Sequence, residues 1–236
     1  EDRGWAVGDE GKLFQWRGHG WSEVRNVVGE GTQVRAIAVV PGTDRPQAWV
    51  AADWMGFGSF HRFTGSFWED SGDDYYGVIK DMEFVDENHG WAISSSIGDS
   101  VFYRWDGSSW SEFARFDDDY IDLALTGADH GWALERGGGV LIWDGTAWTA
   151  GAPISEYSLN AIAAVSEDDA WAVGGTYDLF HWDGSSWNQV WLGISSVYFY
   201  DIAFAGPNVG WMVGDAGVIM RYDGVSWTAL NRAHVP

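Results

Sequence analysis

Three short motifs between residues 201 and 227 decide the fold: Asp201-Ile202-Ala203-Phe204, Gly210-Trp211-Met212-Val213-Gly214 and Asp223-Gly224-Val225-Ser226-Trp227. The Trp of the second motif recurs after Gly or Ala every 39 to 44 residues, and the closing Trp recurs every 38 to 47. Internal repetition at this period is typical of propellers and solenoids. The chain therefore holds six copies of one unit, whose two Trp series are Trp5, Trp49, Trp91, Trp132, Trp171 and Trp211, and Trp21, Trp68, Trp110, Trp148, Trp187 and Trp227.

Each unit predicts four short strands, because its apolar and polar residues alternate with a period of two. The Asp-Gly pair before the closing Trp predicts a tight hairpin, since Gly accepts the positive φ that such a turn needs. Six units of about 40 residues predict an all-β protein, a β-propeller of four-stranded blades. We expect one domain over residues 1–236, with repeats at about 1–28, 29–72, 73–114, 115–151, 152–192 and 193–236.

The first repeat is one strand short. Elsewhere the first strand begins ten residues before the Trp of the Gly-Trp pair, whereas only four residues precede Trp5. We expect either that the segment 231–236 fills the gap or that the chain is a piece of a longer protein, in which case seven blades are allowed.

Composition limits the classes of partner. The 236 residues carry a formal net charge of −22, with 13 Lys and Arg against 35 Asp and Glu. Such a charge disfavours nucleic acid and anionic membranes, and leaves cations, neutral sugars and basic proteins as partners. The absence of Cys excludes disulfides, thiolate zinc sites and a cysteine nucleophile. No apolar run is long enough to predict a transmembrane helix.

The unit at residues 200–227 resembles the repeat of photosystem II assembly/stability factor-like propellers, which belong to the Asp-box (BNR) group. The likeness covers all six units, although the Asp lies four residues before the closing Trp, as in Asp106 to Trp110, where the Asp-box has five. The resemblance implies a binding or assembly scaffold rather than a role in photosynthesis. Members are typically seven-bladed and exported or lumenal, so we expect an extracellular, cell-surface or periplasmic location.

A second likeness is to the six-bladed fucose-binding lectins, which have a turn similar to the one at residues 182–187. In those lectins a Glu on the third strand and an Arg on the second strand hold the sugar. The matching third-strand positions here are apolar, as at Phe102 and Ile219, and the second strands carry no regular Arg. That sugar site therefore does not transfer, and a lectin with sugar pockets between blades stays an alternative.

Most of the Trp residues belong to the repeat. Sixteen of the 18 occupy repeat positions, which leaves Trp54 and Trp191 as candidates for function. Trp54, Met55 and Phe57 lie where the second and third strands are joined by a turn three residues longer than in most units. We expect them either to contact a partner or to fold back and be buried.

Acidic and Tyr residues gather just before the first strands, on the face where we expect the longer loops. Tyr supplies flat amphipathic contact area, and carboxylates attract cations. The carboxylates of Asp73, Asp74, Asp117, Asp118 and Asp119 are candidate calcium ligands, although a solvated acidic rim is the alternative and no run has EF-hand spacing. The Tyr residues predicted to contact a partner are Tyr75, Tyr76, Tyr120, Tyr157, Tyr198 and Tyr200.

These observations predict a binding scaffold and not an enzyme. Its partner would be a protein or a carbohydrate, recognised through the loop-rich face, and no cofactor is expected apart from calcium. Arg residues are too few in the later repeats for a sialidase, and the six His show no ligand spacing. Paired carboxylates leave a glycosidase as a third alternative.

Overall fold

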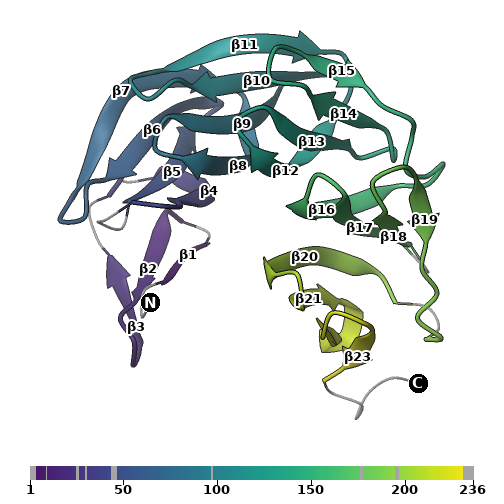
Figure 1. Ribbon diagram of the computed structural model, residues 1–236. Helices are drawn as coiled ribbons and strands as arrows, with labels where there is room; N and C mark the ends of the chain where they lie inside the picture. The colour runs from purple at the N-terminus through teal and green to yellow at the C-terminus, as the bar shows by residue number, and fades with distance from the viewer. Residues whose placement is uncertain are drawn as a thin grey trace. The chain divides into compact units, whose positions relative to one another are not determined.

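The computed structural model describes residues 4–8, 10–24, 27–29, 31–43, 47–96, 98–175, 178–194 and 197–230. Regular structure in this part of the chain is β-strand apart from one 3-10 turn, Asp215–Gly217. The strands form six antiparallel meanders in chain order (Figure 1), five with four strands and the first with three. The all-β class and the propeller fold with four-stranded blades are therefore confirmed.

The chain divides into two compact units, residues 1–119 and residues 120–236, and the predicted single domain stays a prediction. Unit 1 holds three sheets. Their strands are β1 (Gly4–Gly8), β2 (Lys12–Trp16) and β3 (Trp21–Val24); β4 (Gln33–Val40), β5 (Gln47–Trp54), β6 (Phe57–Phe63) and β7 (Trp68–Tyr76); and β8 (Val78–Asp86), β9 (His89–Ser96), β10 (Asp99–Trp105) and β11 (Trp110–Phe116).

Unit 2 also holds three sheets, each of four strands. Their strands are β12 (Tyr120–Gly127), β13 (His130–Glu135), β14 (Val140–Trp143) and β15 (Trp148–Ala150); β16 (Leu159–Ser166), β17 (Asp169–Gly174), β18 (Leu179–Trp182) and β19 (Trp187–Gln189); and β20 (Phe199–Gly206), β21 (Val209–Gly214), β22 (Ile219–Tyr222) and β23 (Trp227–Ala229).

One detail of the strands differs from the expected repeat pattern, and another agrees with it. Strands β7 and β11 run past the expected repeat boundaries at residues 72 and 114. The sheet of β1, β2 and β3 lacks a first strand among the described residues, as the spacing before Trp5 predicts. The segment 231–236, predicted to fill this gap, lies outside the described residues.

The first strand of each four-stranded sheet contains a β-bulge near its start. One residue is skipped in the pairing with the second strand, for example between Tyr120 and Asp122. A bulge turns the following side chain in a new direction. In unit 2 this lets the carboxylate of Asp122 accept a hydrogen bond of 2.7 Å from the backbone N–H of Ile162 in the next sheet. The skipped residues are Arg35, Lys80, Ile121, Asn160 and Tyr200.

The Trp of the Gly-Trp pair packs on aromatic rings of the next sheet. Trp171 lies 5.3 Å from Tyr222 and 5.6 Å from Trp227, measured between ring centroids. Edge-to-face and tilted aromatic pairs of this kind add to the stabilisation that burial provides. The same arrangement in unit 1 joins Trp5 to Phe63 and Trp68, and Trp49 to Phe84, Trp105 and Trp110.

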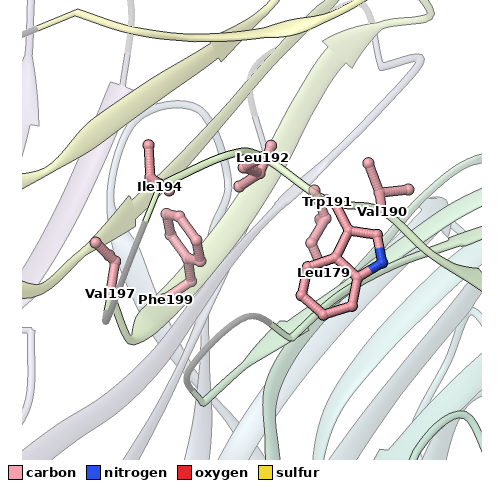
Figure 2. A pocket seen from close by; sticks show the side chains of 7 residues that line it. All are labelled: Leu179, Val190, Trp191, Leu192, Ile194, Val197 and Phe199. Atoms are coloured by element: carbon pink, nitrogen blue, oxygen red, sulfur yellow. The ribbon is translucent and has the colours of Figure 1, made fainter.

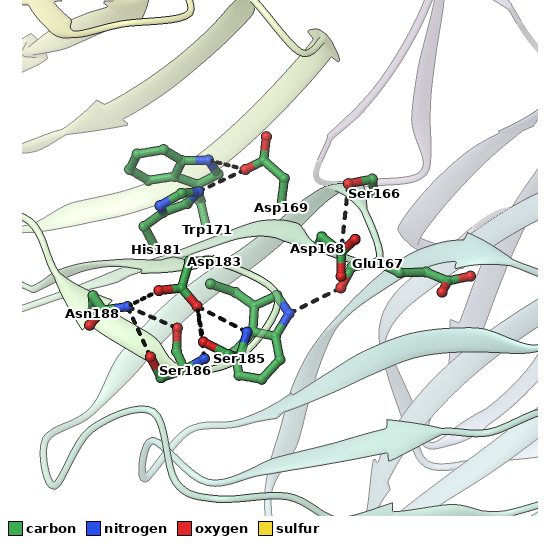
Figure 3. Close-up of polar contacts among 11 residues, drawn as sticks. Ser166, Glu167, Asp168, Asp169, Trp171, His181, Asp183, Ser185, Ser186 and Asn188 are labelled. Carbon is green, nitrogen blue, oxygen red and sulfur yellow. Dashed lines mark hydrogen bonds and ion pairs between the residues drawn. The ribbon is translucent and has the colours of Figure 1, made fainter.

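The Asp-Gly turns close the outer hairpins, as Figure 3 shows for Asp183. Its carboxylate accepts hydrogen bonds from the hydroxyl and backbone N–H of Ser185 (2.7 and 2.9 Å) and from the N–H of Ser186 (3.0 Å). These bonds, the one from the Ser185 hydroxyl first, lower the pKa of Asp183 to about 2. Gly184 supplies the positive φ of 87° that the turn requires. The motif therefore has a structural role, as the repeat pattern predicts.

Candidate functional site

The most prominent exposed apolar cluster of unit 1 is at the end of the β5–β6 hairpin. We call Trp54, Met55, Phe57 and Tyr76 the aromatic tip. Their exposed fractions are 60%, 80%, 69% and 50%. Because soluble proteins rarely gather large apolar side chains at one exposed point without a role in binding, the aromatic tip is a candidate interaction surface.

The backbone of the hairpin holds these side chains out. The predicted longer loop is wrong, because the three added residues lengthen β5 and β6 and leave a turn of only two residues, Met55 and Gly56. Both have positive φ, 53° and 83°, which matches the twist of a tight hairpin. Gly adopts this conformation without strain, whereas Met does so at a cost of about 1 kcal/mol. Strain of this kind is typical of positions under a functional constraint.

The rings of the aromatic tip support one another. Phe57 is paired in register with both Trp54 and Tyr76, and its ring lies 5.6 Å from the Tyr76 ring at 71°. The backbone N–H of Gly77 donates to the carbonyl of Gly56 at 3.0 Å, which fixes the turn against the end of β7. Trp54 and Phe57, for which the sequence allowed burial, are thus displayed to solvent.

Below the tip, an ion pair between an exposed Arg and a buried Asp joins the hairpin to β4. The guanidinium of Arg35 lies 2.6 Å from the carboxylate of Asp53, which is only 3% exposed. Next to this pair, Tyr75 is 4% exposed, and its ring covers Gly58 and contacts Phe60 at 4.9 Å. Burial, followed by the charge of Asp53, raises the pKa of Tyr75.

Two of the Tyr residues predicted to contact a partner are buried, and for them the prediction is wrong. Tyr75 points inward because alternate residues of β7 face opposite sides of the sheet. Tyr120 is the first residue of β12 and directly precedes the bulge, and it is only 5% exposed. Leu159 and Phe199 occupy the same position in their own sheets and are also buried.

The five Asp residues proposed as calcium ligands fall in two places. Asp73 and Asp74 belong to β7 rather than to a loop, and Asp73 accepts a hydrogen bond of 3.0 Å from the backbone N–H of Trp110. Asp117, Asp118 and Asp119 lie exposed between β11 and β12. Within the described ranges, no three His, Asp or Glu side chains are placed to hold a metal ion. The calcium site stays a prediction, which a melting curve with added calcium would test.

Unit 2 contains a second exposed apolar surface, which we call the apolar pocket. Its cavity volume is about 10 Å³, which is room for about one water molecule, and the rest of it is open to solvent. Described residues of the connection between β19 and β20 line it. Near its two ends, the Val190 N–H donates to the Leu179 carbonyl (2.7 Å) and the Asp215 N–H donates to the Tyr198 carbonyl (2.9 Å). Figure 2 shows the lining side chains, which are Leu179, Val190, Trp191, Leu192, Ile194, Val197 and Phe199.

Several predicted contact residues are exposed near this connection or in other parts of unit 2. Trp191 is 70% exposed and lines the pocket, and Tyr198 and Tyr200 are 49% and 57% exposed on either side of the buried Phe199. Tyr157 is 71% exposed between β15 and β16. The hydroxyl of Tyr200 donates to the carboxylate of Asp215, and this hydrogen bond raises the pKa of Tyr200. Their binding role stays a prediction.

Sequence reasoning missed Asp178. The residue as a whole is only 7% exposed. Burial therefore raises its pKa. The sequence signal is weak, since only Gly174 and Gly175 at the end of β17 mark this position.

Two Asp and His arrangements invite comparison with catalytic sites. Oγ of Ser59 lies 2.9 Å from Nε2 of His61, whose pKa is lowered by burial although Asp70 opposite it on β7 opposes the shift. In unit 2, Nε2 of His181 lies 2.9 Å from Asp169, which also accepts from the indole of Trp171 (Figure 3). Neither arrangement lines the apolar pocket.

The fold defines the class of protein, a β-propeller whose blades end in Asp-Gly-x-x-Trp hairpins. Residues 62–223 match the sequence profile of the family described as photosynthesis system II assembly factor YCF48, and the chain belongs to this family. No curated protein sequence matches the chain.

Two solved structures are similar to the chain in fold. One is YCF48 bound to D1 peptide, with a TM-score of 0.74 and 18% identity over 97% of this chain and 77% of that one. The other is YCF48 from Cyanidioschyzon merolae, with a TM-score of 0.70 and 17% identity over 97% of this chain and 80% of that one. At these identities the likeness shows the fold alone.

The family membership corrects the expected location. The YCF48 family is a photosystem II assembly factor of the thylakoid lumen or chloroplast, so the predicted extracellular, cell-surface or periplasmic location is wrong. The resemblance to photosystem II assembly factors therefore indicates a location as well as the scaffold class. Among the described residues, no helix has the length and apolar character needed to cross a membrane.

Proposed function

We propose that the chain is a non-catalytic scaffold that binds a protein segment through the aromatic tip. The observation that carries this proposal is the exposure of Trp54, Met55 and Phe57 on a two-residue turn that strains Met55. Membership of an assembly-factor family supports a protein-binding role. So does the similar structure of YCF48 bound to D1 peptide.

The aromatic tip has the physical properties of a binding anchor. Exposed Trp, Tyr and Phe residues lose little conformational entropy on binding and bury much apolar area. The ring contact between Phe57 and Tyr76 and the hydrogen bond from Gly77 to Gly56 hold the tip in place before a partner arrives. Preorganisation of this kind increases affinity by reducing the entropy lost on association.

The charge of the chain adds selectivity. A formal charge of −22 accelerates encounters with cationic segments and slows those with anionic ones. Asp73 and Asp74, on the same strand as Tyr76, place negative charge close to the tip. The scaffold therefore favours a neutral or cationic segment with apolar side chains.

A titration with D1 peptide, followed by calorimetry, tests the proposal. We expect Trp54→Ala and Phe57→Ala to weaken binding at least tenfold, as is usual for anchor residues. Phe67→Ala is the matched control, because Phe67 is 60% exposed in the turn at the other end of β6. Equal losses in all three variants, or binding unchanged by Trp54→Ala, would contradict the proposal.

Neither carbohydrate alternative gains support. Phe102, at the third-strand position that a fucose lectin fills with Glu, is fully buried. The glycosidase alternative gains no support from the apolar pocket, which is lined only by apolar side chains. Asp86 and Glu87 line a different, open depression in unit 1, together with Gln47 and Asn88. A protein segment is therefore the partner that we propose.

A further inference from the structure

Met55 differs from every other Met of the chain in its exposure to solvent. The sequence has four Met and no Cys, so four thioethers are its only sulfur groups. Met55 is 80% exposed, whereas Met82, Met212 and Met220 are 3%, 1% and 2% exposed. An oxidant in solution can therefore reach one sulfur of the folded chain and not the other three.

The three buried Met residues belong to the cores of the two units. Met82 packs in a core cluster of unit 1, and Met212 and Met220 pack in a core cluster of unit 2, where they are paired across β21 and β22. Oxidation of any of them would place a polar group in apolar packing and destabilise the sheet. A reaction that leaves the sheets folded is therefore confined to Met55.

Met55 also lies at the end of the aromatic tip. It is the first residue of the two-residue turn, directly after Trp54, and Phe57 follows the turn. Trp54 and Phe57 are 60% and 69% exposed, so a change of polarity at Met55 falls within the exposed apolar cluster. The turn itself does not call for a thioether, because Gly adopts the φ of 53° found at Met55 without strain.

We propose that Met55 is a site of reversible oxidation, at which a hydroperoxide converts the aromatic tip from an apolar to a partly polar binding surface. The thioether sulfur attacks one peroxide oxygen, so that an S–O bond forms while the O–O bond breaks. The sulfur loses two electrons. The proton of the transferred oxygen passes to the leaving oxygen, which departs as water when the oxidant is hydrogen peroxide. This inference rests on the proposed function and adds regulation of the same surface.

The sulfoxide weakens binding because of its polarity. Its oxygen accepts hydrogen bonds from water, and these are lost when an apolar partner covers the tip. The chain remains folded, since the exposed Met55 side chain contributes little to the core. Methionine sulfoxide reductases reverse the change: two thiols supply the two electrons and become a disulfide, and the oxygen leaves as water.

Peptide mapping by mass spectrometry tests the site of reaction. The folded chain is treated with dilute hydrogen peroxide, and the oxidised fraction of each Met is followed with time. We expect Met55 to react at least about tenfold faster than each of the other three, and all four to agree within about threefold in urea, where the chain is unfolded. Similar rates for all four in the folded chain would overturn the inference.

Calorimetry with D1 peptide tests the effect on binding. Oxidation of the wild-type chain should weaken binding at least about fivefold, and treatment with methionine sulfoxide reductases A and B and dithiothreitol should restore it. Met55→Leu removes the sulfur, so peroxide should leave the affinity of this variant at its own starting value. Circular dichroism checks that the oxidised chain stays folded. Equal weakening of the wild type and Met55→Leu by peroxide would overturn the inference.

The outcomes distinguish this inference from the proposed function. If D1 peptide binds the reduced and oxidised chains equally and binding depends on Trp54, the proposed function stands and the inference fails. If D1 peptide does not bind the reduced chain, the proposed function fails, and the regulatory role of Met55 fails with it, whatever the peptide mapping shows.

Discussion

The Trp of the Gly-Trp pair is buried to different extents in neighbouring blades, so we expect its replacement by Ala to lower the free energy of unfolding by different amounts. Trp171 is 4% exposed and packs on Tyr222 and Trp227, with His181 stacked on it at 4.1 Å. Trp211 is its equivalent one repeat later, yet it is 37% exposed and contacts no aromatic ring among the described residues. Replacing each by Ala therefore compares a buried and a half-buried copy in the same unit.

The magnitude follows from the exposed surface. A Trp side chain buries up to about 250 Å², and the difference in exposure between Trp171 and Trp211 is about one third of that area. At roughly 25 cal/mol per Å² this amounts to about 2 kcal/mol. Trp171→Ala also leaves a cavity, so we expect it to cost about 3–5 kcal/mol, and Trp211→Ala about 2 kcal/mol or less.

Urea unfolding followed by circular dichroism measures both free energies of unfolding. With a slope of about 2 kcal/mol per M, the two midpoints should differ by about 1 M. Both residues belong to unit 2, so the same transition reports on them. Midpoints that agree within about 0.3 M would refute the argument, because they would show that burial on the next sheet does not determine the stability of the repeat.

Three other substitutions give clear expectations. Asp178→Asn should raise Tm at pH 7, because burial raises the folded pKa of Asp178 and so disfavours its charged form in the folded state. The gain should shrink as pH falls through that pKa towards the unfolded value, and a gain that does not change with pH would rule out this origin. Met55→Gly should stabilise the chain by up to about 1 kcal/mol, as measured by thermal unfolding, because Gly accepts the φ of 53° without strain. A loss of stability would show that the Met55 side chain packs more than its 80% exposure indicates. Hydrogen bonds from Ser108 and Ser109 hold the folded pKa of Asp106 at about 2, below its unfolded value. Asp106→Asn should therefore lower Tm at pH 7, and the difference from the wild type should vanish as pH falls through about 2. A difference that persists below about pH 2 would rule out this origin.

The repeats were predictable because they depend on local signals. The Asp-Gly turn at Asp183 and the Trp spacing are both visible within 40 residues, so the blades and the short first sheet follow from the sequence. Trp54 and Trp191 could be identified as candidates because neither occupies a repeat position, although the sequence left open whether Trp54 is exposed or buried. These two residues identify both candidate surfaces.

The remaining features depend on packing between distant segments. Tyr75 and Tyr120 share the composition of the exposed loops, but strand alternation and a bulge turn them inward. Asp178 lies near a segment distant in sequence, since the Cβ position of Gly175 is close to both the Asp178 carboxylate and the ring of Tyr198. A single sequence contains no clear local signal for either effect, so the burial of these residues is seen only in the structure.

The bulge near the start of each first strand has a consequence for how the repeat can change. The skipped position holds Arg35, Lys80, Ile121, Asn160 and Tyr200, which are cationic, aliphatic, amide and aromatic, on the same backbone geometry. Because the skipped residue takes no part in strand pairing, its identity can vary while the blade is kept. The same backbone geometry therefore accepts side chains of different chemistry, each with contacts of its own, such as Arg35 with Asp53 and Asn160 with the Phe199 carbonyl.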